Sequence, residues 1–399
     1  MCSAALPCAM QQSPLMLHKA AMTAILAVTV WRYPTMRSLS DTLARLKHFR
    51  PTPSALDGKS RLATFGAFGT NPGELEARIH VPAKLTKSPA LVVVLHGCTQ
   101  TAANYDKGSG WSKLADEYGF VVLYPQQTRT NNANLCFNWF QPNDIARDRG
   151  EALSICQMIN TAETRYDIDR SRVYITGLSA GGAMANVMLA TYPEVFAGGA
   201  IIAGLPYGTA RTVPQAFDRM RAQGIPDGQS LQKALRGASK SNGPWPAISV
   251  WHGTQDATVN SANADAIVEQ WKVIHEVEAA VASDTSSGRL ERAIWVGPDG
   301  KERLQLYRIK GMGHGTPIDV KSGYGQAGPY MLDVGISSTE EIARSFGIVA
   351  PSLRQANADA KVNVLAPASR NADSQRQEGP ADGIRRTIED ALRAAGLMR

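Results

Sequence analysis

The middle of the chain alternates short, almost wholly apolar runs with longer stretches in which apolar residues recur every three or four positions. The short runs predict strands covered on both faces, and the longer stretches predict helices. The expected strands are Leu91–Leu95, Phe120–Tyr124, Val173–Thr176, Gly199–Ile202, Ile248–Trp251 and Leu304–Ile309. The expected helices are Ser112–Tyr118, Gly150–Tyr166, Ala180–Tyr192 and Ala262–His275. This alternation favours an α/β fold with a mostly parallel, doubly wound sheet.

The two ends of the chain differ from this middle part. Residues 1–55 read as an N-terminal extension, residues 56–349 as a single α/β domain, and residues 350–399 as a polar tail that ends in an amphipathic helix. Within the domain, residues 207–246 lack a strand pattern and contain several Gly and Pro. A long insertion of this kind predicts a cap over the carboxyl edge of the sheet, where it would shape access to a site.

Composition excludes several classes of protein. Apolar residues make up 44% of the 399 positions, which is ordinary for a chain that buries a core and excludes disorder throughout. Lys and Arg number 42 against 35 Asp and Glu, but part of this excess lies in residues 37–61, ahead of the domain. No aromatic pattern suited to stacking on bases accompanies these basic residues, so we expect a solvated arm and no nucleic-acid partner.

The apolar run at residues 20–31 bears on location. It is too short to span a bilayer, which predicts no stable membrane insertion, but it has the length of a signal-peptide core. We therefore expect a secreted or extracellular protein. A cytoplasmic location stays open because little positive charge precedes the run, no clean cleavage motif follows it, and Met36 is an alternative start. The sequence carries no signal for an oligomeric state.

The cysteines do not form a scaffold. The chain has five, at irregular spacing and without a CxxC pair: Cys2, Cys8, Cys98, Cys136 and Cys156. This number and spacing fit neither a disulfide-rich fold nor a zinc site, so we expect no metal.

The segment Val173-Tyr-Ile-Thr-Gly-Leu-Ser-Ala-Gly-Gly182 leads from a predicted strand through G-x-S-x-G into a predicted helix. This is the context of a nucleophile elbow, in which a sharp turn holds a serine hydroxyl above the sheet. Ser179 is therefore the candidate nucleophile. The alternative is a glycine-rich helix start with a capping serine.

An acid and a histidine follow Ser179 in the chain order that this arrangement requires. Asp256 lies in the loop after the strand Ile248–Trp251 and is the candidate carboxylate that orients the histidine. The alternative is a purely structural role, in which the Asp256 side chain closes the loop as an Asx turn. His314 lies in a glycine-rich loop after the strand Leu304–Ile309 and is the candidate general base. The alternative is a loop histidine that is hydrogen-bonded or exposed and has no catalytic role.

Two backbone N–H groups are expected to stabilise the negative charge that develops on the attacked oxygen. Ala180, the residue after the nucleophile, would supply one. Cys98, in the loop after the first buried strand, would supply the other. A reactive Cys98 thiol is the alternative, but no cationic neighbour in the sequence favours it.

Five separated motifs lie along the domain, namely HGCTQ, NLCFNWFQPND, GLSAGG, HGTQDATV and GPYMLDVGISSTEEIARSFG. Together they resemble the esterase family of poly(3-hydroxybutyrate) depolymerases and the related feruloyl and acetylxylan esterases, over about residues 62–349. The resemblance implies an α/β-hydrolase fold, a single catalytic domain, and Ser179, Asp256 and His314 as a triad. It also implies Cys98 and Ala180 as oxyanion donors and a hydrolase that needs no metal or organic cofactor.

The resemblance further implies a Cys98–Cys136 disulfide and a substrate cleft lined by Trp139 and Phe140, for which core packing is the alternative. The expected substrate is a polyhydroxybutyrate-type polyester or 3-hydroxybutyrate oligomers, and the expected partner is accordingly a polyester or small ester. A feruloyl or acetylxylan esterase is the alternative enzyme, and a non-catalytic binding protein on a hydrolase scaffold is the alternative of another class.

Two departures from the family affect these expectations. Members carry a tryptophan shortly after the catalytic histidine, whereas this chain has His314-Gly-Thr-Pro317, so that wall of the pocket is expected to differ. No Thr-rich linker or polymer-binding module is visible after Val349. Short or soluble esters are therefore expected to be attacked more readily than crystalline polymer.

Overall fold

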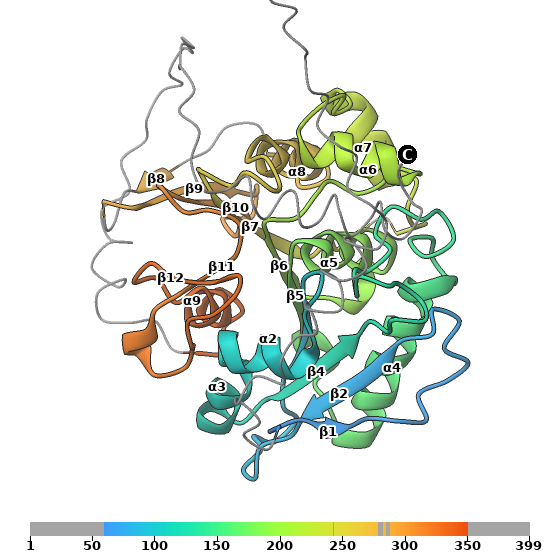
Figure 1. Cartoon of the computed structure of the whole chain (residues 1–399), viewed down its shortest axis with the longest axis vertical. Coiled ribbons are helices and arrows are strands. Elements are labelled where there is room, and N and C mark those ends of the chain that lie inside the picture. Colours follow the sequence, from blue (N-terminus) through green and yellow to red (C-terminus); the bar gives the residue numbers. More distant parts are fainter. Residues whose placement is uncertain (1–59, 242, 278–281, 285–287, 350–399) are drawn as a thin grey trace, which may run out of the picture. The chain divides into compact units, whose positions relative to one another are not determined.

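The structure, a computed structural model, describes residues 60–241, 243–277, 282–284 and 288–349 (Figure 1). The expected extensions, the apolar run at residues 20–31 and the C-terminal amphipathic helix lie outside the described residues. The proposed domain boundaries therefore stay predictions.

One large sheet organises the described chain. Its ten strands, in spatial order, are β1 (Ala63–Thr64), β2 (Glu76–His80), β4 (Val121–Gln126), β3 (Leu91–Leu95), β5 (Val173–Leu178), β6 (Gly198–Ile202), β7 (Ala247–Gly253), β10 (Glu302–Ile309), β9 (Leu290–Val296) and β8 (Ala282–Asp284). The central strands from β4 to β10 run parallel, and the strands outside them pair antiparallel. The parallel strands are the six that the apolar runs predict, so the expected α/β fold is confirmed.

Helices cover both faces of the sheet (Figure 1). One layer contains α4 (Gly150–Tyr166), α5 (Ala180–Thr191) and α8 (Ala262–Lys272), and the other contains α2 (Ala102–Ser109), α3 (Trp111–Tyr118) and α9 (Ser338–Ser345). Strand β3 shows why its sequence is wholly apolar. Its odd-numbered residues pack in the core with α4 and α5, and its even-numbered residues pack in the core with α2 and α3.

The predicted boundaries of the helices need small corrections. Helix α4 has the predicted bounds, α5 ends one residue early, and α8 ends at Lys272 because residues 273–276 form turns in place of the expected last helical turn. Helices α2 and α9 are not predicted, because their sequences, AANYDKGS and STEEIARS, each contain a single large apolar or aromatic residue and so show no repeating apolar face.

The insertion at residues 207–246 contains no strand, as expected, but it is not irregular throughout. It forms two helices, α6 (Val213–Met220) and α7 (Gly228–Arg236). Each has a polar N-cap side chain, Thr212 for α6 and Asp227 for α7, that accepts a hydrogen bond from a backbone N–H in the first turn. A further small sheet pairs β11 (Thr316–Ile318) with β12 (Met331–Asp333) beyond β10.

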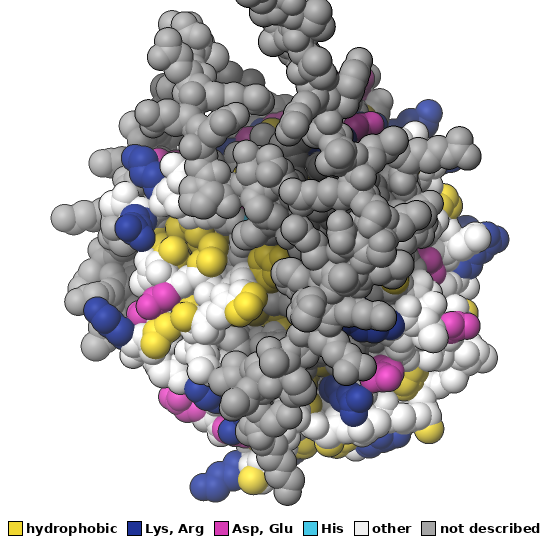
Figure 2. Space-filling view, in the orientation of Figure 1, with side chains coloured by type: hydrophobic (Ala, Val, Ile, Leu, Met, Phe, Trp, Pro, Cys, Tyr) yellow, Lys and Arg dark blue, Asp and Glu magenta, His cyan; other side chains and the backbone are white. Residues whose placement is uncertain are grey.

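Charged side chains of both signs lie on the described surface. Figure 2 shows Lys and Arg side chains scattered among Asp and Glu on the described part of the face in view. Among the described helices, none has both the length and the apolar character needed to cross a bilayer. The described residues also contain no cluster of three or more His, Cys, Asp or Glu side chains that could hold a metal ion.

Candidate active site

Ser179 lies at a sharp bend between β5 and α5. Its φ of 57° and ψ of −117° are unusual for a residue with a side chain and indicate backbone strain. A Cβ at Gly177 would lie 2.4 Å from the carbonyl oxygen of Gly181, and a Cβ at Gly181 would lie 2.4 Å from that of His96. Both glycines are therefore required for strand and helix to approach this closely, which is the local reason that the chain bends at Ser179.

Asp256 lies in the turn after β7, and its carboxylate accepts four hydrogen bonds. Oδ1 accepts from the backbone N–H groups of Thr258 and Val259 at 2.9 and 2.8 Å. Oδ2 accepts from His314 Nδ1 at 2.7 Å and lies 3.3 Å from His252 Nε2. Burial alone would raise the pKa of Asp256, but the adjacent His314 and the hydrogen bonds from His252 and His314 outweigh it and hold the pKa well below its usual value. Asp256 is thus a buried, ionised partner for an imidazole.

His314 lies in the loop between β10 and β11. Because Nδ1 bonds to Asp256, Nε2 is the ring nitrogen left for a reacting group. The edge of the ring faces Tyr330, with ring centres 6.1 Å apart and planes at 81°. Tyr330 also lines the cavity next to His314, a contact that no local motif in the sequence predicts.

Ser179 and His314 line the same cavity, which has a volume of about 270 Å³. Cys98, Trp139 and Phe140 also line this cavity. Asp256 and Ala180 are not among the lining residues. Asp256 bonds to the lining residue His314, and Ala180 follows Ser179 in the chain. Trp139 is only 6% exposed and packs edge-to-face on Phe140, with ring centres 5.5 Å apart. The two aromatic residues thus form a wall of the cavity and also belong to the packed interior.

Helix α6 forms a part of the cavity that the sequence does not identify residue by residue. Val213, Ala216, Phe217 and Met220 line the cavity from one face of this helix. Apolar residues at positions 213, 216, 217 and 220 have the spacing of one helical face, which is the signal that could have identified them. The predicted role of the insertion in shaping the site agrees with this position.

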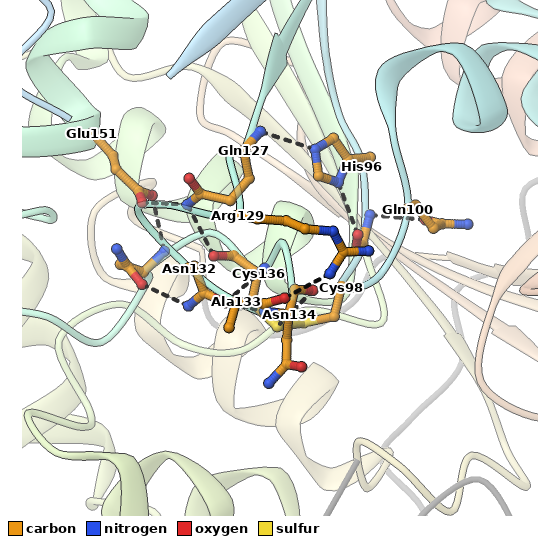
Figure 3. The surroundings of a disulfide bond; sticks show 12 residues. His96, Cys98, Gln100, Gln127, Arg129, Asn132, Ala133, Asn134, Cys136 and Glu151 are labelled. Carbon is orange, nitrogen blue, oxygen red and sulfur yellow. Dashed lines mark hydrogen bonds between the residues drawn. A yellow bond between two sulfur atoms is a disulfide. The ribbon is translucent and has the colours of Figure 1, made fainter. Parts of the chain in front are cut away.

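The two expected oxyanion donors lie at loop and helix ends next to the serine. Ala180 is the first residue of α5, so its backbone N–H has no partner within the helix. Cys98 lies in the turn after β3, and its sulfur is bonded to Cys136 across 38 residues (Figure 3). Since Cys98 is in a disulfide, the alternative of a reactive thiol is wrong. The remaining cysteine of the described chain, Cys156, is buried, which raises the pKa of its thiol to about 11.

His252 is a further residue of this site, fully buried at the end of β7. Its Nε2 lies 2.8 Å from the carbonyl oxygen of Val259 and 3.3 Å from Asp256 Oδ2, so one N–H faces two acceptors. The sequence places His252 beside the acid but gives it no role. The structure places it beside Asp256 Oδ2, the same oxygen that accepts from His314.

Comparison with known proteins identifies the class. A solved acetyl xylan esterase from Aspergillus awamori superposes with a TM-score of 0.62 at 25% identity, covering 72% of this chain and 99% of that one. Feruloyl esterase B of Talaromyces funiculosus is 32% identical over 261 residues, or 63% of this chain and 72% of the relative. With the elbow and the parallel sheet, these likenesses define a carboxylic ester hydrolase of the α/β-hydrolase fold.

The family follows from two more comparisons. The family described as Esterase PHB depolymerase matches residues 77–292. Poly(3-hydroxyalkanoate) depolymerase C of Paucimonas lemoignei is 47% identical over 287 residues, which cover 71% of this chain and 69% of the relative. The chain belongs to the esterase PHB depolymerase family. The resemblance seen in the sequence is thereby confirmed, and the alternative of a non-catalytic binding protein loses its support.

Proposed function

We propose that this esterase hydrolyses polyhydroxybutyrate-type polyesters or 3-hydroxybutyrate oligomers through a triad of Ser179, His314 and Asp256. The observation that carries the proposal is the 2.7 Å hydrogen bond from His314 Nδ1 to the buried Asp256 carboxylate, at a cavity that His314 shares with the strained Ser179. A carboxylate bound to Nδ1 fixes the tautomer in which Nε2 is unprotonated and can accept a proton.

Hydrolysis proceeds by two acyl transfers. In the first, Ser179 Oγ attacks the ester carbonyl carbon while His314 Nε2 takes the hydroxyl proton, and the C–O bond to the alcohol breaks as that proton passes to the leaving oxygen. In the second, His314 takes a proton from water, whose oxygen attacks the acyl-serine ester; the C–O bond to Ser179 Oγ then breaks as that proton passes to Oγ, which releases the acid and restores Ser179. Asp256 stabilises the imidazolium that forms in both steps.

The proposed oxyanion donors are the backbone N–H groups of Ala180 and Cys98. The N-terminus of α5 adds a favourable dipole at the carbonyl oxygen, where negative charge develops. The disulfide to Cys136 supports this role because it fixes the turn that contains Cys98 to the loop that contains Cys136, which also lines the cavity.

The lining of the cavity supports a substrate with apolar substituents. Trp139, Phe140 and Phe217 offer aromatic surface on which the methyl-bearing units of a 3-hydroxyalkanoate can pack. The 47% identity to a poly(3-hydroxyalkanoate) depolymerase supports the same choice.

A feruloyl or acetylxylan esterase is the second candidate. The side of the cavity formed by residues 131–138 includes Asn131, Asn132 and Asn134. The Asn134 side chain could bind sugar hydroxyl groups, whereas the amides of Asn131 and Asn132 form hydrogen bonds within the protein.

Two experiments test the proposal. A Ser179→Ala variant should lose at least about 10⁴-fold in kcat on p-nitrophenyl butyrate, and activity near that of the parent would end the assignment. The parent should release acid faster from soluble 3-hydroxybutyrate oligomers than from ethyl ferulate or acetylated xylan; the reverse order would support the second candidate.

We propose in addition that the protein is exported. The Cys98–Cys136 disulfide supports this location because such bonds persist in oxidising compartments outside the cytoplasm. Fusion of residues 1–40 to a reporter that is active only after export should give activity. An inactive reporter, with the native esterase found in the cytoplasmic fraction, would support the cytoplasmic alternative.

A further inference from the structure

Glu151 is a buried carboxylate to which the proposed mechanism gives no role. It is the second residue of α4, and its side chain is fully buried. A carboxylate in such a position costs free energy unless hydrogen-bond donors surround it. Its partners therefore indicate why an acidic residue is placed there.

All the hydrogen bonds to the Glu151 carboxylate come from one loop, residues 127–141. Oε1 accepts from Gln127 Nε2 at 2.6 Å and from Asn131 Nδ2 at 3.1 Å. Oε2 accepts from the backbone N–H of Asn138 at 2.9 Å. Most of residues 131–141 line the ester cavity, including the aromatic wall of Trp139 and Phe140. One side chain thus binds both ends of the loop that forms this wall.

The contacts continue from Gln127 toward the turn that contains Cys98 (Figure 3). The backbone N–H of Gln127 donates to His96 Nε2 at 3.1 Å, and His96 Nδ1 donates to the carbonyl oxygen of Gly97 at 2.8 Å. The Gln127 side chain also donates to the carbonyl oxygen of Cys136 at 3.0 Å. Glu151 is therefore connected to both halves of the Cys98–Cys136 bridge.

We propose that Glu151 is a positioning residue that determines specificity for large esters, by holding the 127–141 loop against the cavity in register with the turn that contains Cys98. This inference rests on the proposed function, in which that cavity binds the ester. Glu151 itself touches no reacting atom. Its effect reaches the substrate through the wall, so small esters that do not need the wall should be the least affected.

The substitution that tests this is Glu151→Gln, which keeps the shape of the side chain. The NH₂ group of the new side chain would face N–H donors at a place where a carboxylate oxygen now accepts hydrogen bonds. The loop must therefore shift. Burial, followed by the nearby Asp144, raises the pKa of Glu151 to about 8, so the variants are compared at pH 9, where Glu151 carries the negative charge; in a buried position that charge is itself costly. Removing that charge offsets part of the loss of hydrogen bonds, so a change in specificity is expected without unfolding.

The readout is the ratio of kcat/KM for butyl butyrate to kcat/KM for ethyl acetate, followed by acid release. Butyl butyrate is extended on both sides of its carbonyl, so it reaches the wall whichever side lies there. We expect the ratio to fall about tenfold in Glu151→Gln, mostly through KM for butyl butyrate, because a displaced wall misplaces the bound ester.

The matched control is Glu163→Gln, the same change on the same helix. Glu163 pairs with Arg170 at 3.1 Å and does not line the cavity, so the ratio for Glu163→Gln should equal that of the parent.

Should Glu151→Gln fail to fold, Gln127→Leu tests the same contact from the other side. It removes one donor to the carboxylate and should lower the ratio in the same direction by a smaller factor.

An unchanged ratio in a folded variant would overturn the inference, as would an equal loss on both esters that follows the fall in the urea midpoint. Failure of the proposed function has a different signature. In that case Ser179→Ala keeps its activity, or the parent hydrolyses neither ester. Both results are obtained without the Glu151 variant, so the two failures can be told apart.

Discussion

The carboxyl ends of the sheet strands and the walls of the cavity are held in place by different means. Ser179, Asp256 and His314 follow β5, β7 and β10, so backbone pairing within the sheet sets their positions. The walls come from the 127–141 loop and α6, which side-chain hydrogen bonds, a disulfide and helix packing hold against the sheet. In the proposed function, the reacting side chains thus follow strands of the central sheet, whereas the walls that contact the substrate are held by side-chain bonds and helix packing.

The largest expected effect lies at the strand ends. Asp256→Asn should lower kcat on the order of 10⁴-fold, because an amide in place of the carboxylate favours the wrong tautomer of His314 and cannot stabilise the imidazolium. Hydrolysis of p-nitrophenyl butyrate checks this.

A matched control is Asp265→Asn on α8, another acid that follows the nucleophile in the sequence. Asp265 pairs with Arg308 on the protein surface and is about half exposed, so its kcat should stay within about twofold of the parent. Equal effects of the two substitutions would contradict the role proposed for Asp256.

The next effect concerns the walls. Replacement of both Cys98 and Cys136 by alanine opens a loop with a sequence separation of 38 residues. The free energy of unfolding should fall by about 4 kcal/mol, since the unfolded chain regains the freedom that the crosslink removes. Urea unfolding at constant pH measures this change. A loss below about 1 kcal/mol would contradict this contribution of the crosslink.

A smaller effect is expected from pH, through His96. Burial lowers the pKa of His96 to about 4, below the usual 6.5, so its contribution to stability is complete above pH 6.5 and is lost as pH falls toward 4. Protonation would also place a hydrogen on Nε2, which accepts the Gln127 N–H. From pH 7.5 to pH 5 this loss amounts to about 2 kcal/mol.

The prediction for His96 compares the stability of the parent with that of His96→Gln, because other groups titrate over the same pH range. The pKa of His275 is lowered to about 4 by burial and acts in the same sense, whereas the raised pKa of Glu151 acts in the opposite sense between pH 4.5 and 8. The stability advantage of the parent over His96→Gln should therefore shrink by about 2 kcal/mol between pH 7.5 and pH 5. A constant difference would contradict a buried, neutral His96.

The same contrast explains what the sequence could predict. Five of the six parallel strands are covered on both faces and read as largely apolar runs, and the sixth, β10, alternates apolar with polar residues. The strand ends then locate Ser179, Asp256 and His314. The edge strands β2 and β9 mix charged and apolar residues, so no apolar run marks them. Local patterns therefore suffice for the centre of the fold but not for its margins.

Contacts between distant segments account for the residues that the sequence did not reveal. Nothing near Tyr330 indicates that it packs on His314, and Phe217 is found only once α6 is known to face the cavity. The pairing of Cys98 with Cys136 was expected solely from the family resemblance, because spacing alone does not select partners among five cysteines. Glu151 reads in sequence as an ordinary acidic residue in the first turn of a helix.

The most direct test of the central claim is to locate the covalent adduct that a fluorophosphonate forms with the protein, by peptide mass spectrometry. The proposed triad predicts one adduct, on the peptide that contains Ser179, which forms rapidly in the parent and is lost in Ser179→Ala. It also predicts much slower labelling in His314→Ala. An adduct on another residue, or full esterase activity in a protein whose Ser179 is labelled, would contradict the account.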